Sequence, residues 1–600
     1  MISKLSDEDC WELFKQNAFG PNEVERKELV VIGKEILRKC GGVPLAAKAL
    51  GSLLRFKREE KEWRYIKESE LWNLQDEDNV MPALRLSYLN LPIKLRQCFV
   101  FCALFRKGER ISKQLVIELW MANGFILSNK ILNEEDIGNE VWNELYWRSF
   151  FQDFERDVFG EIISFKIHDL VHDLAQSISE EVCCITENDD MPDRLERIRH
   201  LSVNKNISAS VDSIWMRNVK SLRTYTRSYH YDVYYSPFKV FEFRSLHVLT
   251  VTLSDVPSSI GHLKCLSYLD LSCGSFETLP ESICKLWNLQ NLKLDTCLML
   301  IKLPKNLIRL KALQHLSLYN CLDLSSLPPN IGKMTSLKTL SMYVVGKGSG
   351  YLLSELGQLN FKVDKLDITN LERVESVKDA KEANMLSKHV NCLRLRWESN
   401  IVSLLQENVE QILEVLQPYP QQLQELWVEG YTGSRFPEWM SSPSLTHLRE
   451  LTLDDCKSCL RLPQLGNLPS LKELTIWGCS QIEGLDEALQ HLAALQYLEL
   501  EDFPNLTSLP ALGNLSSLQH LSIRVCPKLI CLPASIQSLT NLKSLKIYNC
   551  PELEKRCNRE TGEDWPKISH IQDLSGMFWN SRPFLIHFDT SIYYIVHLSF

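Results

Sequence analysis

The sequence predicts an α/β fold in which a leucine-rich-repeat solenoid, curved as a horseshoe, follows a helical N-terminal third. Two observations lead to this prediction. A leucine phrase, L-x-x-L-x-L-x-x-C, restarts every 23 or 24 residues through most of the C-terminal part, and the first 180 residues lack it. A single repeat cannot bury its own apolar side, so the repeats must stack on one another. The clearest copies occupy residues 289–297, 313–321, 448–456, 471–479, 518–526 and 542–550.

Each repeat is expected to contribute one strand, because the alternation in L-x-L turns both leucines to the same side. The segment after the strand often reads L-P-x-x-I, as at Leu279-Pro280 and Leu532-Pro533. Proline lacks an N–H donor, so this convex side should be irregular, without strands or long helices. Weaker copies begin near residues 198, 222, 246, 266 and 337, and from 346 to 420 the spacing drifts, with strands expected near Leu366 and Leu393.

Outward-facing strand residues line the concave face of the predicted horseshoe. Aromatic residues and arginine are typical anchors of protein interfaces. We therefore predict that this face binds a partner protein through Tyr319, Arg394, Arg396, Trp427, Trp477 and Tyr548. Other outward positions hold Lys293, Asp295, Tyr343 and Arg524, and at any one position plain solvated strand surface is the alternative interpretation.

Composition limits the classes of function. The net charge of −9 disfavours general nucleic-acid binding, which needs clustered Lys and Arg. The sequence contains no run of about 18 apolar residues that would predict a membrane-spanning helix, and the first residues have no apolar core of a secretion signal. We therefore expect a cytoplasmic protein, with the nucleus or a peripheral position at the plasma membrane as alternatives.

Most of the 19 cysteines recur at one repeat position, where a small, semi-apolar side chain packs well. Reduced thiols are expected, as in the cytosol. Cys456 and Cys459 form a lone C-x-x-C, for which packing is a better interpretation than zinc or redox chemistry, because no second pair accompanies it.

The N-terminal third contains four blocks with amphipathic helical character. The first, residues 5–19, reads L-S-D-E-D-C-W-E-L-F-K-Q-N-A-F and begins with an N-cap pattern. The second, residues 41–48, reads G-G-V-P-L-A-A-K and describes a glycine turn feeding a helix that begins at Pro44. The third comprises C-F-V-F-C-A-L-F at 98–105 and L-W-M-A-N-G-F-I at 119–126, and the fourth is I-H-D-L-V-H-D-L at 167–174.

In this order the blocks resemble those of plant nucleotide-binding leucine-rich-repeat (NB-ARC/LRR) disease-resistance proteins of the coiled-coil class. The second block is similar to the family's "GLPL" motif, and the third to the block that opens its winged-helix domain. The fourth is similar to the "MHD" motif, with Ile167 where the family usually has Met. The resemblance implies an ADP/ATP cofactor, with Pro44 against the adenine and His168 on the β-phosphate of ADP. It also implies that the repeats restrain the nucleotide-binding domain and recognise a pathogen effector or a guarded host protein.

The sequence has no G-x-x-x-x-G-K-[ST] loop and no paired-Asp strand for magnesium, which precede the first block in the family. We therefore expect weak or absent nucleotide binding, no hydrolysis and no enzymatic activity, and we interpret the chain as N-terminally truncated. The predicted domains are the helical end of the NB-ARC domain (1–75), a winged-helix domain (76–180), the leucine-rich repeats (195–555) and a tail (556–600). Residues 571–600 receive no physical interpretation.

Three alternatives use the same residues. His168 and His172 have the i, i+4 spacing of zinc proteases, but Asp169 stands where those enzymes need Glu and no third ligand is evident. A winged helix could bind DNA, although no basic recognition stripe is present. A nucleotide-independent leucine-rich-repeat scaffold, whose helical N-terminus only caps the solenoid, is the main alternative to the receptor hypothesis.

Overall fold

The computed structural model divides into two compact units, Met1–Leu271 with Lys285–Asn291 and Ser272–Cys284 with Leu292–Phe600. Each unit is described by itself. The structure describes residues 5–19, 26–73, 80–128, 131–157, 160–179, 182–186, 195–203, 219, 221–227, 238–360, 362–398, 406–485, 488–489 and 491–574. The sequence expectations for residues 575–600 therefore lie outside the described residues.

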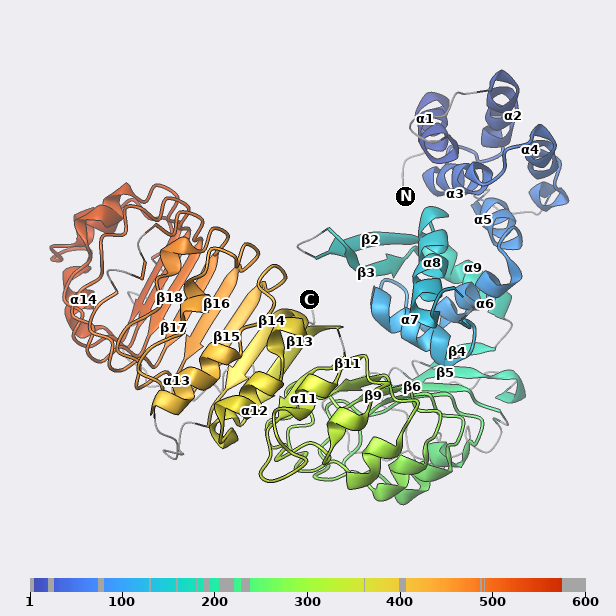
Figure 1. Ribbon diagram of the computed structural model, residues 1–600. Helices are drawn as coiled ribbons and strands as arrows, with labels where there is room; N and C mark the ends of the chain where they lie inside the picture. Colours follow the sequence, from blue (N-terminus) through green and yellow to red (C-terminus); the bar gives the residue numbers. More distant parts are fainter. Residues whose placement is uncertain are drawn as a thin grey trace. The chain divides into compact units, whose positions relative to one another are not determined.

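The first unit begins with four short helices that pack around one apolar core (Figure 1). Ser6 caps the first helix as its sequence predicts, because the Ser6 side chain accepts the backbone N–H of Asp9. Gly41 and Gly42 have φ of 61° and 81°, so the turn before α3 uses left-handed backbone that glycine adopts without strain. The helices are α1 (Asp7–Ala18), α2 (Lys27–Arg38), α3 (Pro44–Arg55) and α4 (Glu60–Lys67), followed by the 3-10 helix η1 (Glu70–Asn73).

A winged-helix domain follows, in which helices surround a three-stranded antiparallel sheet of order β1-β3-β2. Its core is rich in aromatic side chains, among them Phe99, Trp120, Trp142 and Phe150, each at most 1 % exposed. The elements are α5 (Val80–Leu89), α6 (Ile93–Phe101), η2 (Cys102–Leu104), β1 (Arg110–Ser112), α7 (Lys113–Ala122), α8 (Glu134–Trp147), β2 (Phe151–Arg156), β3 (Ile162–Ile167) and α9 (Asp169–Ser179).

The first repeats belong to the same unit and form a parallel ladder in chain order. They begin earlier than the clear leucine phrases, since β4 precedes the first weak copy of the pattern. The strands are β4 (Cys183–Thr186), β5 (His200–Val203), β6 (Thr224–Arg227), β7 (Val248–Thr250) and β8 (Tyr268–Asp270), with η3 (Leu195–Arg197), η4 (Phe238–Glu242) and η5 (Ser258–His262) between them. The division between the units falls inside the repeats, near η6 (Glu281–Lys285) and β9 (Asn291–Lys293).

The second unit contains the long part of the solenoid. β10 (His315–Ser317) pairs with β11 (Thr339–Leu340), and a nine-stranded parallel sheet then runs in chain order from β12 to β20. Strands β13 to β18 lie side by side in Figure 1. The strands are β12 (Met342–Val344), β13 (Lys362–Thr369), β14 (His389–Arg396), β15 (Glu425–Glu429), β16 (Glu450–Asp454), β17 (Glu473–Trp477), β18 (Tyr497–Glu501), β19 (His520–Arg524) and β20 (Ser544–Tyr548).

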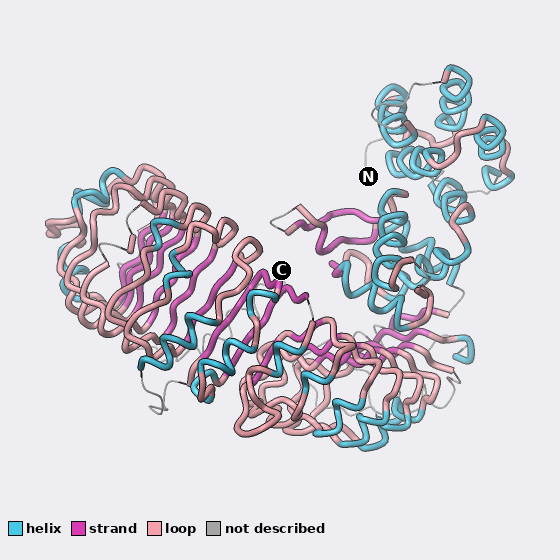
Figure 2. The backbone as a smooth tube through the Cα atoms, in the orientation of Figure 1, coloured by secondary structure: helices cyan, strands magenta, loops and turns pink. Residues whose placement is uncertain are grey.

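The side opposite the strands consists mostly of loops and short helices, as the L-P-x-x-I segments predict (Figure 2). Pro304 and Pro533 each stand immediately before a 3-10 helix, where a fixed φ and a missing donor cost nothing. The 3-10 helices are η7 (Lys305–Arg309), η8 (Ile331–Lys333), η9 (Leu371–Arg373), η10 (Met385–Ser387), η11 (Glu438–Ser441), η12 (Leu465–Asn467) and η13 (Ala534–Ser538). The α-helices are α11 (Glu355–Gln358), α12 (Val377–Glu382), α13 (Gln406–Val415), α14 (Pro551–Arg556) and α15 (Trp565–Ile568).

The register of the strands stacks the repeat leucines on top of one another. Leu451 of β16 lies opposite Leu474 of β17, and Leu453 lies opposite Ile476. These side chains are 0 % exposed, and burying each contributes roughly 1.5–3 kcal/mol, so the stack is stable although one repeat is not. The repeat cysteines at 297, 321, 456, 479, 526 and 550 are also 0 % exposed, which confirms their packing role.

The C-x-x-C pair is part of this packing. Cys456 and Cys459 are both completely buried, and the Cys459 thiol donates to the carbonyl of Arg461 at 3.0 Å. Within the described parts of the chain, no group of three or more His, Cys, Asp or Glu residues has an arrangement that could hold a metal ion. No helix in those parts has the length and apolarity needed to cross a membrane.

The predicted domain boundaries remain predictions. The winged-helix elements run from Val80 to Ser179, whereas the division into compact units falls about ninety residues further on, inside the repeats. The difference arises because the first repeats pack directly on the winged-helix domain. Val248 and Tyr268 of the repeats, both 0 % exposed, belong to the same apolar core as that domain.

Candidate functional site

The candidate site is the outward side of strands β13 to β20 in the second unit. Inward and outward residues alternate along each strand, so that β15 buries Leu426 and Val428 and turns Glu425, Trp427 and Glu429 outward. The parallel register places equivalent outward residues of neighbouring strands directly opposite one another. The outward face therefore carries three rows of side chains that cross the sheet.

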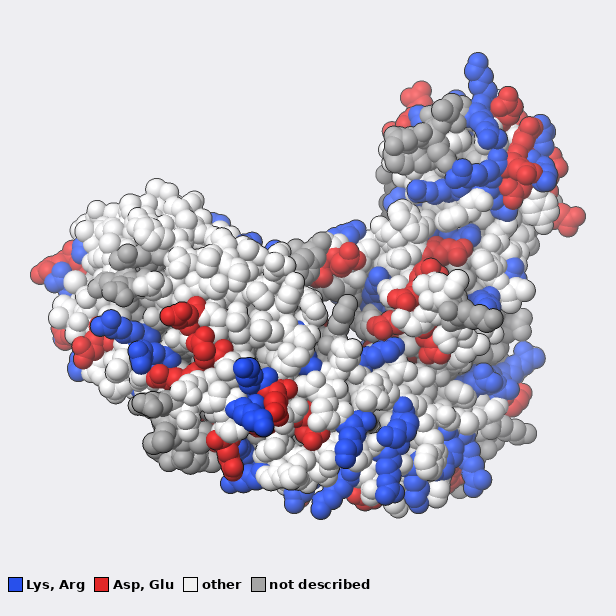
Figure 3. All heavy atoms as spheres, viewed as in Figure 1, with Lys and Arg blue, Asp and Glu red and all other residues white. Residues whose placement is uncertain are grey.

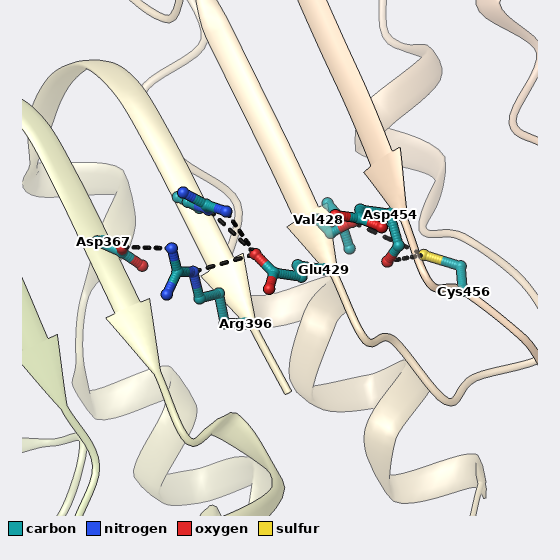
Figure 4. Close-up of polar contacts among 7 residues, drawn as sticks. Asp367, Arg396, Val428, Glu429, Asp454 and Cys456 are labelled. Atoms are coloured by element: carbon teal, nitrogen blue, oxygen red, sulfur yellow. Dashed lines mark hydrogen bonds and ion pairs between the residues drawn. The ribbon is translucent and has the colours of Figure 1, made fainter. Parts of the chain in front are cut away.

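Two arginines of β14 hold one end of this face together. Arg394 donates to Glu429 Oε2 from Nε at 3.2 Å and from Nη2 at 2.7 Å, and its guanidinium lies over the Trp427 ring at 4.5 Å. Arg396 lies between two carboxylates in Figure 4, with Nη2 3.5 Å from Asp367 Oδ2 and Nε 3.1 Å from Glu429 Oε2. The contact of Arg396 Nε with Glu429 is an ion pair without hydrogen-bond geometry, since that nitrogen has no hydrogen-bond acceptor.

This network corrects one expectation about Arg394 and Arg396. The sequence predicts solvent-facing side chains, but the side chains of Arg394 and Arg396 are only 20 % and 13 % exposed. Their carboxylate partners lie on the strands to either side, so the arginines contribute to strand-to-strand cohesion as well as to the surface. Charge reversal at these positions should therefore perturb the sheet as well as the surface.

A small hollow of about 30 Å³ lies beside the network. Its lining consists of Tyr319, Ser341, Lys365, Leu366, Asp367, Cys392, Arg394, Glu425 and Trp427. Asp367 is 5 % exposed, and its Oδ1 has no hydrogen-bond partner. Burial raises the pKa of Asp367 despite the opposing charges of Arg396 and Arg394.

A row of carboxylates crosses the face at the first outward position of each strand. Glu425, Glu450 and Glu473 lie opposite one another on β15, β16 and β17. Burial, together with the charges of Glu425 and Glu473, raises the pKa of Glu450 to about 7. In the outermost row, burial and the charge of Glu429 raise the pKa of Asp454 to about 7. Like charges this close stabilise the protonated form.

The six predicted anchors are distributed unevenly. Tyr319, Arg394 and Trp427 meet at the hollow, and Arg396 lies next to it. Trp477 is two strands away from Trp427, opposite Asp454, and its indole N–H has no acceptor. Tyr548 is 51 % exposed on β20, opposite Arg524 and away from the hollow.

Tyr343 was also expected to face outward, and that prediction is wrong. The residue is 1 % exposed and its hydroxyl donates to the Leu352 carbonyl at 2.6 Å. All three residues of β12 are buried, because the segment that follows the strand, the 346–360 region, packs against it. The repeat spacing is irregular in this region, so the periodicity of the sequence does not predict the contact between Tyr343 and Leu352.

Sequence reasoning missed the acidic residues of the face. The signal was available, since four successive strands read E-L-W-V-E, E-L-T-L-D, E-L-T-I-W and Y-L-E-L-E, with acids at the first or last outward position. The prediction of interface anchors considered aromatic residues and arginine only, and it therefore left these acidic residues out. Lys365, Asp367 and Cys392 were missed for a different reason, because the repeat spacing drifts around β13 and β14.

The two residues predicted to contact nucleotide lie in the first unit. Pro44 occupies the first turn of α3, and His168 directly precedes α9. His168 Nδ1 accepts the backbone N–H of Leu170 at 3.3 Å, which leaves the ring proton on Nε2. Burial lowers the pKa of His168, and the charge of Lys48, one turn after Pro44, lowers it further.

His172 has a structural role. The ring is 1 % exposed and its Nε2 donates to the Phe105 carbonyl at 2.6 Å, which fixes α9 against the end of α6 and η2. A nitrogen committed in this way is not available as a metal ligand. The other ring nitrogen of His172, Nδ1, is buried and has no hydrogen-bond partner.

Fold and site together define a leucine-rich-repeat protein with a winged-helix domain. Residues 104–175 match the family model "Disease resistance protein Winged helix domain", and residues 353–479 match "R13L1/DRL21 LRRs". The chain is similar to plant disease-resistance proteins. It is 37 % identical over 81 % of its length to disease resistance protein RGA2 of Solanum bulbocastanum, covering 48 % of that protein.

Two further relatives show the same similarity. Putative disease resistance protein RGA1 of Solanum bulbocastanum and putative disease resistance RPP13-like protein 1 of Arabidopsis thaliana are each 37 % identical over 81 % of this chain, which covers 47 % of each. The chain thus spans about half the length of these relatives. An LRR protein of Leptospira interrogans aligns with 64 % of this chain and 92 % of its own at 22 % identity, with a TM-score of 0.37, too low to add to the fold described above.

Proposed function

We propose that this protein is a plant immune receptor that recognises a pathogen effector or a guarded host protein through the outward face of β13 to β20. The disease-resistance names of its relatives support the receptor role. The observation that carries the recognition part is the clustering of Tyr319, Arg394 and Trp427 around a hollow on that face. Aromatic and arginine side chains at a concave site are typical of interface anchors.

The first unit is proposed to belong to a nucleotide-controlled switch. The Nε2–H of His168 is suited to donate to a phosphate, and Pro44 presents an apolar ring at the start of α3. The negatively charged phosphates of bound ADP would accept the hydrogen bond from His168 Nε2–H. The residues of this chain provide only these two contacts to ADP, one from His168 and one from Pro44. The sequence lacks a G-x-x-x-x-G-K-[ST] loop and a magnesium-binding carboxylate pair, which would provide the others. Release of a contact between the repeats and a nucleotide-binding domain would then be a shift between two states.

A receptor role implies binding and no chemical turnover, so the protein is proposed not to be an enzyme. The cytoplasm is the proposed location, with the nucleus or the plasma-membrane surface as alternatives. The second candidate function is a nucleotide-independent interaction scaffold, which the missing phosphate loop favours. Calorimetric titration with ADP discriminates the switch from the scaffold when it is carried out with and without the nucleotide-binding domain of a close relative. A switch should bind ADP more tightly when that domain is added, and the gain in affinity should depend on His168. A scaffold should show no such gain.

The receptor proposal is tested in a plant that carries this gene. A loss-of-function line, challenged with a panel of pathogens, is expected to permit greater growth of at least one of them, and the wild-type chain should restore resistance. Trp427→Ala should fail to restore it, whereas Trp287→Ala should succeed, since Trp287 is a 64 % exposed tryptophan outside strands β13 to β20. Equal growth of every pathogen in both lines would contradict the proposal.

A further inference from the structure

The repeats that carry β10 and β11, in the second unit, have an unusual balance of charge for this chain. Residues 296–338 include six Lys or Arg and one acid, Asp323, whereas the whole chain has a net charge of −9. Five of these six cations are exposed and lie outside the strands, in the turns and the 3-10 helices η7 and η8. These five residues are called here the basic surface: Lys302, Lys305, Arg309, Lys311 and Lys333.

The cations of the basic surface have no carboxylate partners. Among the residues that the structure describes, none of the five lies within ion-pair distance of an Asp or Glu. Glu281 of the preceding repeat accepts a hydrogen bond from Asn306 at 3.1 Å and pairs with none of them. Figure 3 shows Lys and Arg side chains gathered over the short helices of this part of the chain, with few acids between them.

The repeat geometry places like charges at equivalent positions. Arg309 and Lys333 each end the 3-10 helix of their repeat, and Lys305 begins the helix that Arg309 ends. Like charges on neighbouring turns repel one another, so the fold gains no stability from this cluster. The cluster is suited to an anion supplied from outside the chain.

Exposed apolar side chains accompany the basic surface. The turn that leads directly into Lys302 exposes Leu298, Met299 and Ile301 by 43 %, 47 % and 36 %, and Leu322 is 38 % exposed at the position of Leu298 in the next repeat. These four side chains are called the apolar edge. Their two turns adjoin, because the backbone N–H and the hydroxyl of Ser325 both donate to the Ile301 carbonyl at 3.0 Å.

The combination of the two features distinguishes among anionic partners. A nucleic acid favours exposed aromatic side chains on which bases stack, but the one Phe, Tyr or Trp of residues 296–338 is Tyr319, which lines the hollow on the strand side. An acidic peptide accounts for the cations alone. The surface of an anionic bilayer accounts for the exposed aliphatic side chains as well, since these enter the interface while Lys and Arg keep their charged ends among the headgroups.

We propose that this part of the second unit binds the surface of an anionic phospholipid bilayer. The apolar edge enters the boundary between headgroups and acyl chains, and the basic surface contacts the lipid phosphates and carboxylates. The binding is peripheral and reversible, because it uses a few side chains and no membrane-spanning segment. The proposal goes beyond the recognition proposed above, since it involves turns and 3-10 helices and none of the outward residues of β13 to β20.

The test measures co-sedimentation of the whole protein with vesicles. Vesicles of phosphatidylcholine alone are compared with vesicles in which about one third of the lipid is phosphatidylserine. The protein is expected to bind the mixed vesicles at least tenfold more tightly, and its affinity should fall as NaCl is raised from about 50 to 300 mM. Equal binding to both kinds of vesicle, or no binding to the mixed vesicles at the lowest salt, overturns the proposal.

A matched pair of triple variants tests the basic surface. Replacement of three of its cations, Lys302→Gln, Lys305→Gln and Arg309→Gln, should weaken binding to the mixed vesicles at least tenfold. The control carries Arg461→Gln, Lys472→Gln and Lys546→Gln, which remove the same charge at exposed, unpaired positions of later repeats and should alter binding less than twofold. Equal losses in both triples would mean attraction by net charge alone and would overturn the proposal.

A second pair of variants tests the apolar edge. Leu298→Ser with Ile301→Ser should weaken binding at least fivefold. Leu460→Ser with Ile530→Ser is the control, because these residues occupy the position of Ile301 in later repeats and are 57 % and 53 % exposed. Full binding by the first double variant would show that no side chain enters the bilayer and overturns the proposal.

A measurement on the unaltered chain excludes effects of the substitutions on folding. Hydrogen exchange at the amides of residues 298–311 should slow when mixed vesicles are added, whereas the equivalent turn at 457–465 should not change. Protection at 457–465 without protection at 298–311 contradicts the proposal.

Two competitors separate the bilayer from other anions. Glycerophosphoserine, which is the headgroup without acyl chains, should not release the protein from the vesicles, and release would indicate a site for a free phosphate ester. A polyglutamate peptide or a single-stranded oligonucleotide should bind more weakly than the mixed vesicles. Tighter binding of either, with the same loss in the Lys302, Lys305 and Arg309 triple, would make that polymer the partner and overturn the proposal.

Discussion

The residue before each repeat cysteine adopts left-handed backbone, and two of these residues, Thr296 and Val525, are β-branched and poorly suited to it. Asn320 and Asn549 have φ of 60° and 55°, and Gly478 has φ of 64°. Asparagine and glycine tolerate this region, whereas a β-branched side chain is strained there. Val525 occupies the equivalent position with φ of 52°.

Val525→Asn is therefore expected to raise the free energy of unfolding by about 1 kcal/mol. The measurement is the urea concentration at the midpoint of unfolding, followed by circular dichroism. Asn549→Val, the reverse exchange one repeat later, should lower stability by a similar amount. If both substitutions shift the midpoint in the same direction, left-handed strain is not the cause.

Glu450 provides a pH-dependent prediction. Its pKa in the folded protein is raised to about 7 by burial and by Glu425 and Glu473, against the weaker opposing influence of Lys365. The folded state then holds a proton that the unfolded state releases between about pH 4.5 and 7, so the contribution of Glu450 to stability falls as pH rises through that window and is constant above it.

Glu450→Gln should consequently stabilise the protein above pH 7, by about 1–2 kcal/mol once solvent screening is allowed for, and have little effect at pH 4.5. Urea midpoints at pH 4.5, 6 and 8 measure the difference. A gain that is the same at all three values would show that Glu450 titrates normally.

How much the sequence reveals depends on the residue. The burial of Leu451 and Cys456 follows from local periodicity, because each repeat repeats the same environment. The partners of Arg396 do not follow from periodicity, since Asp367 and Glu429 are 29 and 33 residues away across irregular connections. Left-handed backbone at Val525 could not be predicted from its side chain, which disfavours that conformation. Periodicity thus predicts which residues are buried. The partners of polar side chains depend on how neighbouring strands are aligned, which periodicity does not predict.

At the scale of elements, the Asp367–Arg396–Glu429 network joins β13, β14 and β15. Arg396→Met would remove the only ion-pair partner recorded for Asp367 among the described residues, and Asp367 is almost fully buried. Breaking a buried pair by removing one member costs about 3–5 kcal/mol, because it leaves an uncompensated charge. The elevated pKa of Asp367 moderates this cost through protonation, so about 2–3 kcal/mol is expected.

Urea denaturation of Arg396→Met, Asp367→Asn and the double variant tests this expectation. The double variant should lose less stability than the two single variants lose together. In the double variant residue 367 is an uncharged amide, so no buried charge is left without a partner. Strictly additive losses would mean that Arg396 and Asp367 act independently, in which case Glu429 alone holds the Arg396 side chain.

At the scale of the whole molecule, the first unit joins two kinds of domain through a buried chain of hydrogen bonds. The Thr224 hydroxyl donates to Asn123 Oδ1 at 3.0 Å, so His200 Nδ1, 2.9 Å from that hydroxyl, must carry the proton and donate to it. Asn123 belongs to the L-W-M-A-N-G-F-I block and ends α7, whereas Thr224 begins β6 of the repeats. The asparagine of that block is thus one of the points at which the winged-helix domain attaches to the first repeats.

This attachment predicts that the winged-helix domain and the first repeats, residues 80–271, unfold as one cooperative body, with no separate transition for the winged-helix domain. Thr224→Val keeps the side-chain volume but leaves Asn123 Oδ1 and His200 Nδ1 without partners in a site that is 0 % exposed at Thr224, at a cost of about 1–3 kcal/mol. Asn123→Leu should cost a similar amount, and the pair should show a coupling energy of about 1 kcal/mol in a double-mutant cycle. Hydrogen exchange provides the second readout, because amides of α7 and β6 should lose protection together in either single variant. Loss confined to β6 would show that the winged-helix domain folds without the repeats, and the shared core around Val248 and Tyr268 would then be a contact between independently stable domains.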